Sequence, residues 1–212
     1  MSYIEQVKEY VKKALNSPRQ SLSHRMDHIE RVMSNAEHIA AAFPSVDREI
    51  LALAVLLHDV SQPYDDKAHH AEASCGLAGE ILNVVGYPKE RSELVLKIVR
   101  EHSTETIEYC KPSSIEAKIL FDADKIDGLG ATGIARVFCL FGQMGKHPLT
   151  AIAWYRTKIL RSLENICTEV GGQMFREKLR FVERFLEVLE SENRDISSAM
   201  EIVQEKGEGP SQ

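Results

Sequence analysis

The sequence has few cysteines, and their positions exclude the most common thiolate sites. Its 212 residues contain four cysteines, and no two of them form a CxxC pair. Closely spaced cysteines are typical of structural zinc sites and of the disulfide frameworks of small secreted proteins. We therefore expect neither kind of site from the four residues, which are Cys75, Cys110, Cys139 and Cys167.

The sequence also lacks a long apolar run and a basic excess. No apolar stretch is long enough to span a bilayer, and the first residues, MSYIEQVK, have no signal-peptide core. The net charge of −6 argues against a broad surface for a nucleic-acid polymer. These absences predict a cytoplasmic protein whose partners are neither a membrane nor a nucleic-acid polymer. A metal and a few local cations could still bind a small anion.

What the sequence has in abundance is the apolar spacing of amphipathic helices. No strand signal is convincing, and Walker A, GxGxxG and GxSxG motifs are absent, so we expect an all-α fold. We predict one helical domain over 1–204 and a mobile tail over 205–212. The expected helices cover 3–15, 22–42, 69–85, 88–102, 149–167 and 172–190, the apolar run after its N-cap Asp47, and the segment after its N-cap Ser114.

The most informative feature is the pair His58-Asp59 at the end of the apolar run 50–60. This run is expected to be buried on most faces, where two ionisable side chains are costly unless something satisfies them. A metal ion would satisfy them, and His28 and Asp124 are suitable further ligands. Each residue also has an ordinary interpretation, with His28 as a hydrogen-bonded helix histidine and Asp124 as part of a solvated helix end.

Several sequence blocks occur in order around these residues, namely HIERV, LLHDV, HAEA, EHS and AKILFDADKIDGLGATGIAR. In this order they resemble the bacterial single-domain branch of the HD-domain superfamily of phosphohydrolases. The resemblance covers a core at 23–135 and, more weakly, the C-terminal helices at 149–190. It implies a helical bundle whose metal site lies between central helices and takes Mn, Fe, Mg, Ni or Zn. The positions that match the family's metal ligands are His28, His58, Asp59 and Asp124.

Some members of this family bind a second metal through histidines between the His-Asp pair and the last aspartate. The resemblance makes His70 and His102 the available positions, with Asp59 bridging the two metals. The alternatives are that His70 begins a helix in solvent and that His102 lies at a helix C-terminus. One block departs from the family, because Arg25 follows Ser23-His24 where many relatives have an acidic residue.

Hydrolysis of a phosphate ester needs a nucleophilic water, neutralised phosphoryl charge and a proton for the leaving group, and a metal supplies part of this. Glu72 is our candidate for the general base, with a solvated helix carboxylate as the alternative. Lys125 and Asp127 are further candidates to face the substrate, where Lys125 could pair with phosphate. Arg136 and Lys146 are interpreted as ordinary surface charges.

Two further patterns concern packing. Glycines at 128, 130 and 133 follow the aspartate cluster instead of a strand, so we expect them to allow close contact between helices. The amphipathic C-terminal helix could cover the core or form a dimer face, and the core interpretation is favoured. The expected oligomeric state is accordingly a monomer or a weak homodimer.

Together these observations predict a metal-dependent phosphohydrolase that acts on a nucleotide or another small phosphorylated metabolite. Members of the resembling branch hydrolyse nucleoside triphosphates to monophosphate and pyrophosphate, which favours a nucleotide pyrophosphohydrolase. The alternatives are a 5'-nucleotidase, a phosphodiesterase, or a module that binds metal or nucleotide without catalysis. A fold that supports all these functions does not decide among them.

Overall fold

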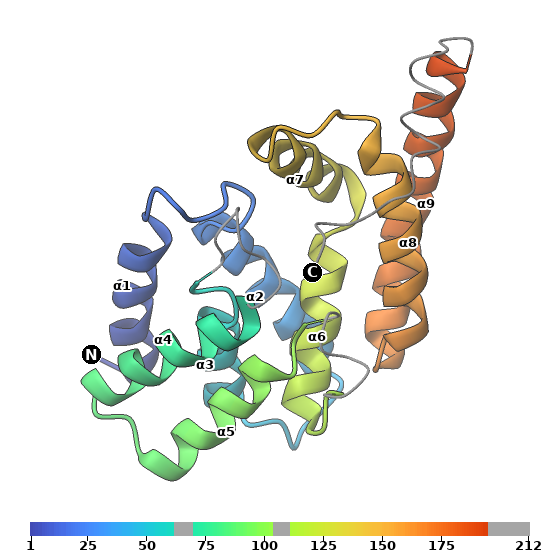
Figure 1. Cartoon of the computed structure of the whole chain (residues 1–212). Coiled ribbons are helices and arrows are strands. Elements are labelled where there is room, and N and C mark those ends of the chain that lie inside the picture. The colour runs from blue at the N-terminus through green and yellow to red at the C-terminus, as the bar shows by residue number, and fades with distance from the viewer. Residues whose placement is uncertain (62–69, 104–110, 195–212) are drawn as a thin grey trace.

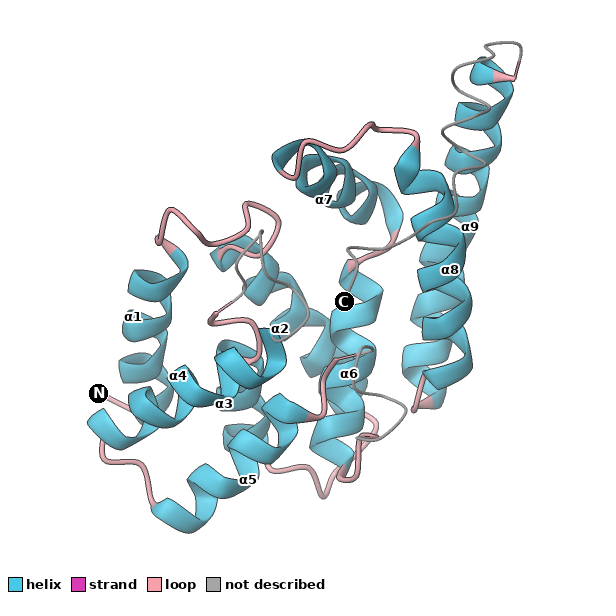
Figure 2. Cartoon of the chain, in the orientation of Figure 1, coloured by secondary structure: helices cyan, strands magenta, loops and turns pink. Residues whose placement is uncertain are grey.

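The computed structural model describes residues 1–61, 70–103 and 111–194. Over these ranges the chain forms nine helices and no strand, which confirms the predicted all-α fold (Figure 1, Figure 2). The predicted mobile tail at 205–212 lies outside the described residues. The helices are α1 (Tyr3–Leu15), α2 (Met26–Ala40), α3 (Arg48–Leu57), α4 (His70–Val84), α5 (Lys89–Arg100), α6 (Ile115–Asp127), α7 (Gly130–Gln143), α8 (Thr150–Asn165) and α9 (Glu169–Asn193).

Local sequence explains where several helices begin. At the start of α1, the side chain of Ser2 accepts a hydrogen bond from the backbone N–H of Glu5, whose carboxylate accepts one from the backbone of Ser2. Asp47 caps α3 and Ser114 caps α6, as predicted. Pro88 is the N-cap of α5 and lies just before the first turn in which we expected it, a one-residue difference that is ordinary at helix ends.

Helix α7 is not among the helices that we predicted, because glycines weaken the helical propensity of its first turn. Gly130 has a φ of +70°, which allows the sharp turn out of α6. Gly133 passes so close to the end of α6 that an added Cβ atom would lie 2.3 Å from the carbonyl carbon of Gly128. The close packing expected from these glycines is therefore observed between α6 and α7.

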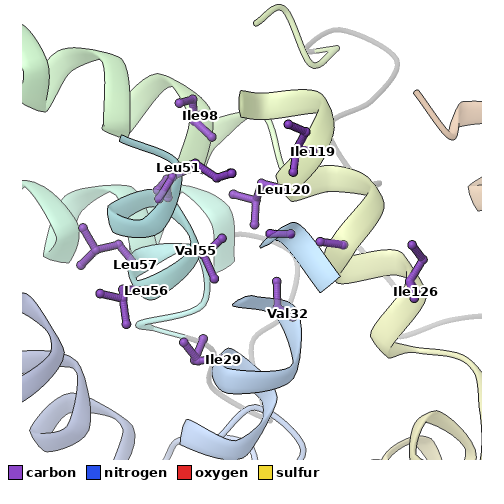
Figure 3. Close-up of a cluster of buried hydrophobic side chains, with 14 of the residues drawn as sticks. Ile29, Val32, Leu51, Val55, Leu56, Leu57, Ile98, Ile119, Leu120 and Ile126 are labelled. Carbon is purple, nitrogen blue, oxygen red and sulfur yellow. The ribbon is translucent and has the colours of Figure 1, made fainter. Parts of the chain in front are cut away.

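The apolar run forms α3, which neighbouring helices surround. Seven of its ten residues are buried, so no polar stripe faces solvent. It contacts α1, α2, α5 and α6, and Figure 3 shows side chains of α2, α5 and α6 meeting those of α3. Burial of this apolar surface stabilises the fold. The buried helix α3 also places the pair His58-Asp59, which follows its C-terminal end, inside the protein.

The C-terminal helices extend the core on the far side of α6. Figure 1 shows α6 between α3 and the pair α8 and α9, and α9 contacts both α6 and α7. The apolar stripe of α9 is buried against them, which agrees with the favoured core interpretation of this helix. None of the helices in the described ranges has the combination of length and hydropathy that a bilayer span demands.

Candidate metal centre

Four side chains from separate parts of the sequence converge beside the end of α3. His28 projects from α2, His58 and Asp59 directly follow α3, and Asp124 belongs to α6. The Nε2 atom of His28 lies 3.2 Å from Nε2 of His58. The same atom lies 3.4 Å from Oδ2 of Asp59 and 3.7 Å from Oδ1 of Asp124. Atoms bound at about 2.1 Å to one metal lie about 3 to 3.5 Å apart, so the cluster is close to the spacing of a common ion.

A second cluster shares Asp59 with the first. The Oδ1 atom of Asp59 lies 3.4 Å from Nε2 of His102 and 4.0 Å from Nε2 of His70. His70 begins α4 and His102 follows α5, and both side chains are buried. His70 therefore begins a helix, but it does not do so in solvent. The two oxygens of one carboxylate thus face two separate sets of ligand atoms.

Backbone carbonyls determine which ring nitrogen of two histidines carries the proton. The Nδ1 atom of His58 donates to the carbonyl oxygen of Val55 at 2.8 Å, and Nδ1 of His102 donates to that of Val99 at 2.5 Å. Since a carbonyl oxygen only accepts, the Nε2 atom of each neutral ring bears a lone pair. Both lone pairs point toward acceptor atoms of the clusters.

Opposed lone pairs of this kind are satisfied by a cation. The Oδ1 atom of Asp59 is buried and makes no hydrogen bond within the part of the chain that the structure describes. A buried carboxylate oxygen without a partner is costly. Imidazole and carboxylate ligands are those that divalent transition metals accept. The residues of both clusters therefore fit divalent metal ions.

Three of the four ligands in the first cluster are held in the deprotonated form that a metal requires. Burial lowers the pKa of His58 to about 4, which keeps its ring neutral at neutral pH. Burial raises the pKa of Asp59, but the charge that His58 gains in acid and the hydrogen bonds from nearby imidazoles outweigh it and hold that pKa well below its usual range. Lys125 has the same effect on the pKa of Asp124. These three ligands bind a metal without a cost in proton release. Burial lowers the pKa of His28, but its hydrogen bonds to Asp127 and Asp59 outweigh burial and raise that pKa, so a metal competes with a proton there.

Asp127 supports the first cluster from behind His28. Its side chain is 1% exposed, and its Oδ2 atom accepts a hydrogen bond from Nδ1 of His28 at 2.8 Å. Its Oδ1 atom accepts from Nε of Arg31 at 2.8 Å, and Arg136 pairs with Oδ2. A carboxylate on the far nitrogen of a ligating histidine orients the ring and determines its tautomer. Asp127 therefore lies behind His28, whereas we expected it to face the substrate.

The other two candidate catalytic residues have contrasting surroundings. The Nζ atom of Lys125 lies 2.6 Å from Oδ2 of Asp124, and its side chain is 6% exposed. The side chain of Glu72 is 72% exposed and pairs with Arg100 at 3.5 Å. Lys125 therefore lies next to the first cluster of ligand residues, whereas Glu72 lies at the surface in an ion pair.

Arg136 is not the surface charge that we predicted. Its side chain is 13% exposed, and its Nε atom donates to the carbonyl oxygen of Ser23 at 2.7 Å. The prediction was wrong because α7 was not expected, so nothing indicated what its inner face would contact. Arg25, where the family resemblance predicts an acidic residue, donates from Nη1 to the carbonyl oxygen of Leu15 at 2.5 Å and so connects α1 with the start of α2.

Sequence reasoning missed the supporting roles of Gln20 and Arg31. The Nε2 atom of Gln20 donates to the carbonyl oxygens of His24 at 2.9 Å and Asp59 at 3.2 Å, which connects the loop before α2 to the His-Asp pair. The ring of His24 also reaches the site, since its Nε2 atom lies 3.9 Å from Oδ2 of Asp59. Arg31 follows His28 by three residues, and this helical spacing is the signal that could have identified it.

Comparison with known proteins reveals the family. The HD domain model matches residues 25–129. The uncharacterized protein YpgQ of Bacillus subtilis (strain 168) is 30% identical over 196 residues, which are 89% of this chain and 92% of YpgQ. The relative thus matches the chain well beyond the part that the domain model covers.

Solved structures show the same similarity. The crystal structure of Bacillus subtilis YpgQ in complex with ADP is similar with a TM-score of 0.68 and 26% identity, over 92% of this chain and 99% of that chain. An HD-superfamily hydrolase from Bacillus thuringiensis is similar with a TM-score of 0.66 and 28% identity, over 91% of this chain and 97% of that chain. By its sequence, its helical fold and its His/Asp cluster, the chain belongs to the HD-domain superfamily of phosphohydrolases.

Proposed function

We propose that the protein is a metal-dependent phosphohydrolase that acts on nucleotides. The observation that carries this proposal is the position of Asp59, whose two carboxylate oxygens face two adjacent clusters of ligand atoms. The first metal would be held by His28, His58, Asp59 and Asp124, and a second by Asp59, His70 and His102. Each cluster would hold a divalent ion such as Mn, Fe, Mg, Ni or Zn.

When bound, a divalent metal lowers the pKa of water and neutralises phosphoryl charge. The protein's own residues hold the ligands in place for this. Asp127 orients His28 through Nδ1, and Lys125 occupies the oxygen of Asp124 that does not face His28. Lys125 also provides a positive charge beside the cluster, where it would favour an anionic substrate.

A nucleotide substrate is supported by one relative. The structure of Bacillus subtilis YpgQ was determined in complex with ADP, and that protein is similar to this chain over nearly its whole length. Within this class we favour hydrolysis of a nucleoside triphosphate between its α and β phosphates. That reaction consumes one water and yields a nucleoside monophosphate and pyrophosphate.

The test is product analysis with a panel of nucleotides after loading with Mn²⁺. We expect monophosphate and pyrophosphate from triphosphates, with activity lost in His58→Gln and retained in His38→Gln, an exposed histidine of α2. Release of inorganic phosphate from monophosphates would favour a 5'-nucleotidase instead, and cleavage of a diester would favour a phosphodiesterase. Stabilisation by nucleotide without turnover of any substrate would contradict the proposed enzyme and favour a binding module.

A further inference from the structure

Arg136 contacts one carboxylate oxygen and two backbone carbonyl oxygens beside the first cluster of ligand residues. Its Nη1 atom pairs with Oδ2 of Asp127 and also donates to the backbone carbonyl oxygen of Asp127 at 3.2 Å. Its Nε atom donates to the carbonyl oxygen of Ser23, in the loop before α2. One guanidinium group therefore connects α7 with the end of α6 and with the segment that leads into the His28 helix.

Asp127 is held from both sides as a result. Arg31 donates to Oδ1, while Nδ1 of His28 and Nη1 of Arg136 share Oδ2. The terminal torsion of an aspartate is broad when nothing restricts it. Donors on both oxygens restrict the rotation of this carboxylate, and the carboxylate in turn restricts the ring of His28.

We propose that Arg136 is a positioning residue for metal binding, which acts through Asp127 to hold the ring of His28 with Nε2 directed at the first cluster. Arg31 shares this role from the side of α2. The inference rests on the proposed function, because it assumes that the first cluster binds a metal. It assigns α7 a part in the metal site, although α7 contributes none of the ligand residues identified in the described chain.

The geometry supports a role in positioning as well as in folding. The Nε2 atom of His28 is the ligand atom at the centre of the first cluster, within 3.7 Å of an atom from each of the other three ligands. A small rotation of its ring would change all three distances. Loss of an outer partner of a ligating histidine typically weakens metal affinity by about 10-fold to 100-fold.

The experiment is titration of metal-free protein with Mn²⁺ by calorimetry, together with the absorption spectrum of the Co²⁺-loaded protein. Arg136→Met is expected to weaken Mn²⁺ binding by about 10-fold to 100-fold and to alter the Co²⁺ bands. Arg136→Lys, which keeps the charge but not the fork of donors, is expected to restore part of the affinity. The matched control is Arg91→Met, because Arg91 connects α5 to α3 through Asp47 and Glu49 and lies outside both clusters.

Each outcome distinguishes the inference from its alternatives. Folded Arg136→Met with wild-type affinity and spectrum would overturn the role of Arg136, and equal loss in Arg91→Met would assign the effect to general destabilisation. If Arg136→Met does not fold, the same titration of Arg136→Lys and Arg31→Met decides the question, with wild-type affinity in both overturning it. A wild-type protein that binds no Mn²⁺ would contradict the proposed function and, with it, this inference.

Discussion

The Oδ1 atom of Asp59 lies 3.4 Å from Nε2 of His102, while Oδ2 of the same carboxylate lies 3.4 Å from Nε2 of His28. One buried side chain thus belongs to two ligand clusters that are built from different helices. Since both histidine nitrogens bear lone pairs when the rings are neutral, the carboxylate has no ring proton to accept from either side. This relationship is the structural basis for expecting two metals.

Because the two clusters have different histidine ligands, replacing a ligand of one cluster should remove one metal ion and leave the other. His102→Ala should remove the second metal and leave the first, because His102 belongs only to the second cluster. Measured by elemental analysis after loading with Mn²⁺ and removal of excess metal, the content should fall from about two ions per chain to about one. His147→Ala, outside both clusters, is the control and should keep the wild-type content. An unchanged content in His102→Ala would contradict the second site.

Glu72→Gln tests the proposed general base. The carboxylate is 72% exposed and pairs with Arg100, so we expect retained metal content and a kcat within about threefold of the wild type. Steady-state kinetics with the substrate found in the panel supplies the measurement. Loss of turnover with the metal retained would instead support the role of Glu72 as a base in the substrate complex, where catalytic hydrogen bonds often tighten.

The buried ring of His58 predicts a pH dependence of stability in the metal-free protein. Its pKa is about 4 in the folded state and 6.5 ordinarily, so between these values the unfolded chain binds the proton more strongly. The stabilisation from keeping this ring neutral is therefore complete above pH 6.5 and is lost as the pH falls toward 4. Between pH 7 and pH 5 the loss amounts to about 2 kcal/mol.

Urea denaturation of metal-free wild type and His58→Gln at these two pH values measures that contribution. The free energy of unfolding should fall more steeply in the wild type than in the variant, by about the stated amount. Parallel losses in the two proteins would show that His58 does not titrate as its burial implies.

Two glycines of α7 predict opposite effects of the same substitution. Gly133→Ala places a Cβ atom 2.3 Å from the carbonyl carbon of Gly128, which the backbone can relieve only by separating α6 from α7. We expect a loss of stability of about 2 kcal/mol or more. Gly142→Ala, in the same helix with no atom of another helix within 4 Å of the added Cβ, should stabilise by a few tenths to about 1 kcal/mol.

Thermal denaturation followed by circular dichroism compares these two variants. A lower melting temperature in Gly133→Ala and an equal or higher one in Gly142→Ala is the expected pair of results. Equal destabilisation of both would indicate that α7 tolerates no side chain at either position and that the contact with α6 is not the cause.

Sequence reasoning found the residues with a local signal and missed those defined by tertiary contact. The buried run before His58-Asp59 and the caps at Asp47 and Ser114 depend on nearby residues, so they could be predicted. Helix ends were less exact, as α2 begins at Met26 and not at residue 22. The role of Arg136 depends on how α7 packs against α6. Helix α7 was not predicted, because the glycines in its first turn have low helical propensity.

The supporting shell of the metal centre could not be read from spacing alone. Asp127 and His28 are 99 residues apart, and only the packing of α2 against α6 brings their side chains together. In the sequence, Asp127 is one of three neighbouring aspartates that look equivalent. The structure separates them, because Asp124 faces the ligand atoms while Asp122 accepts hydrogen bonds from Cys167 and Thr168 at the start of α9.

The most direct test of the account is the metal content of protein purified without added metal, measured by elemental analysis beside Asp59→Ala. Because Asp59 belongs to both clusters, the account predicts near-stoichiometric divalent transition metal in the wild type and almost none in the variant. The variant should remain folded by circular dichroism, so that the loss reflects the missing ligand. A wild type that stays free of metal even after incubation with Mn²⁺, Fe²⁺, Ni²⁺ and Zn²⁺ would contradict the metal-dependent function.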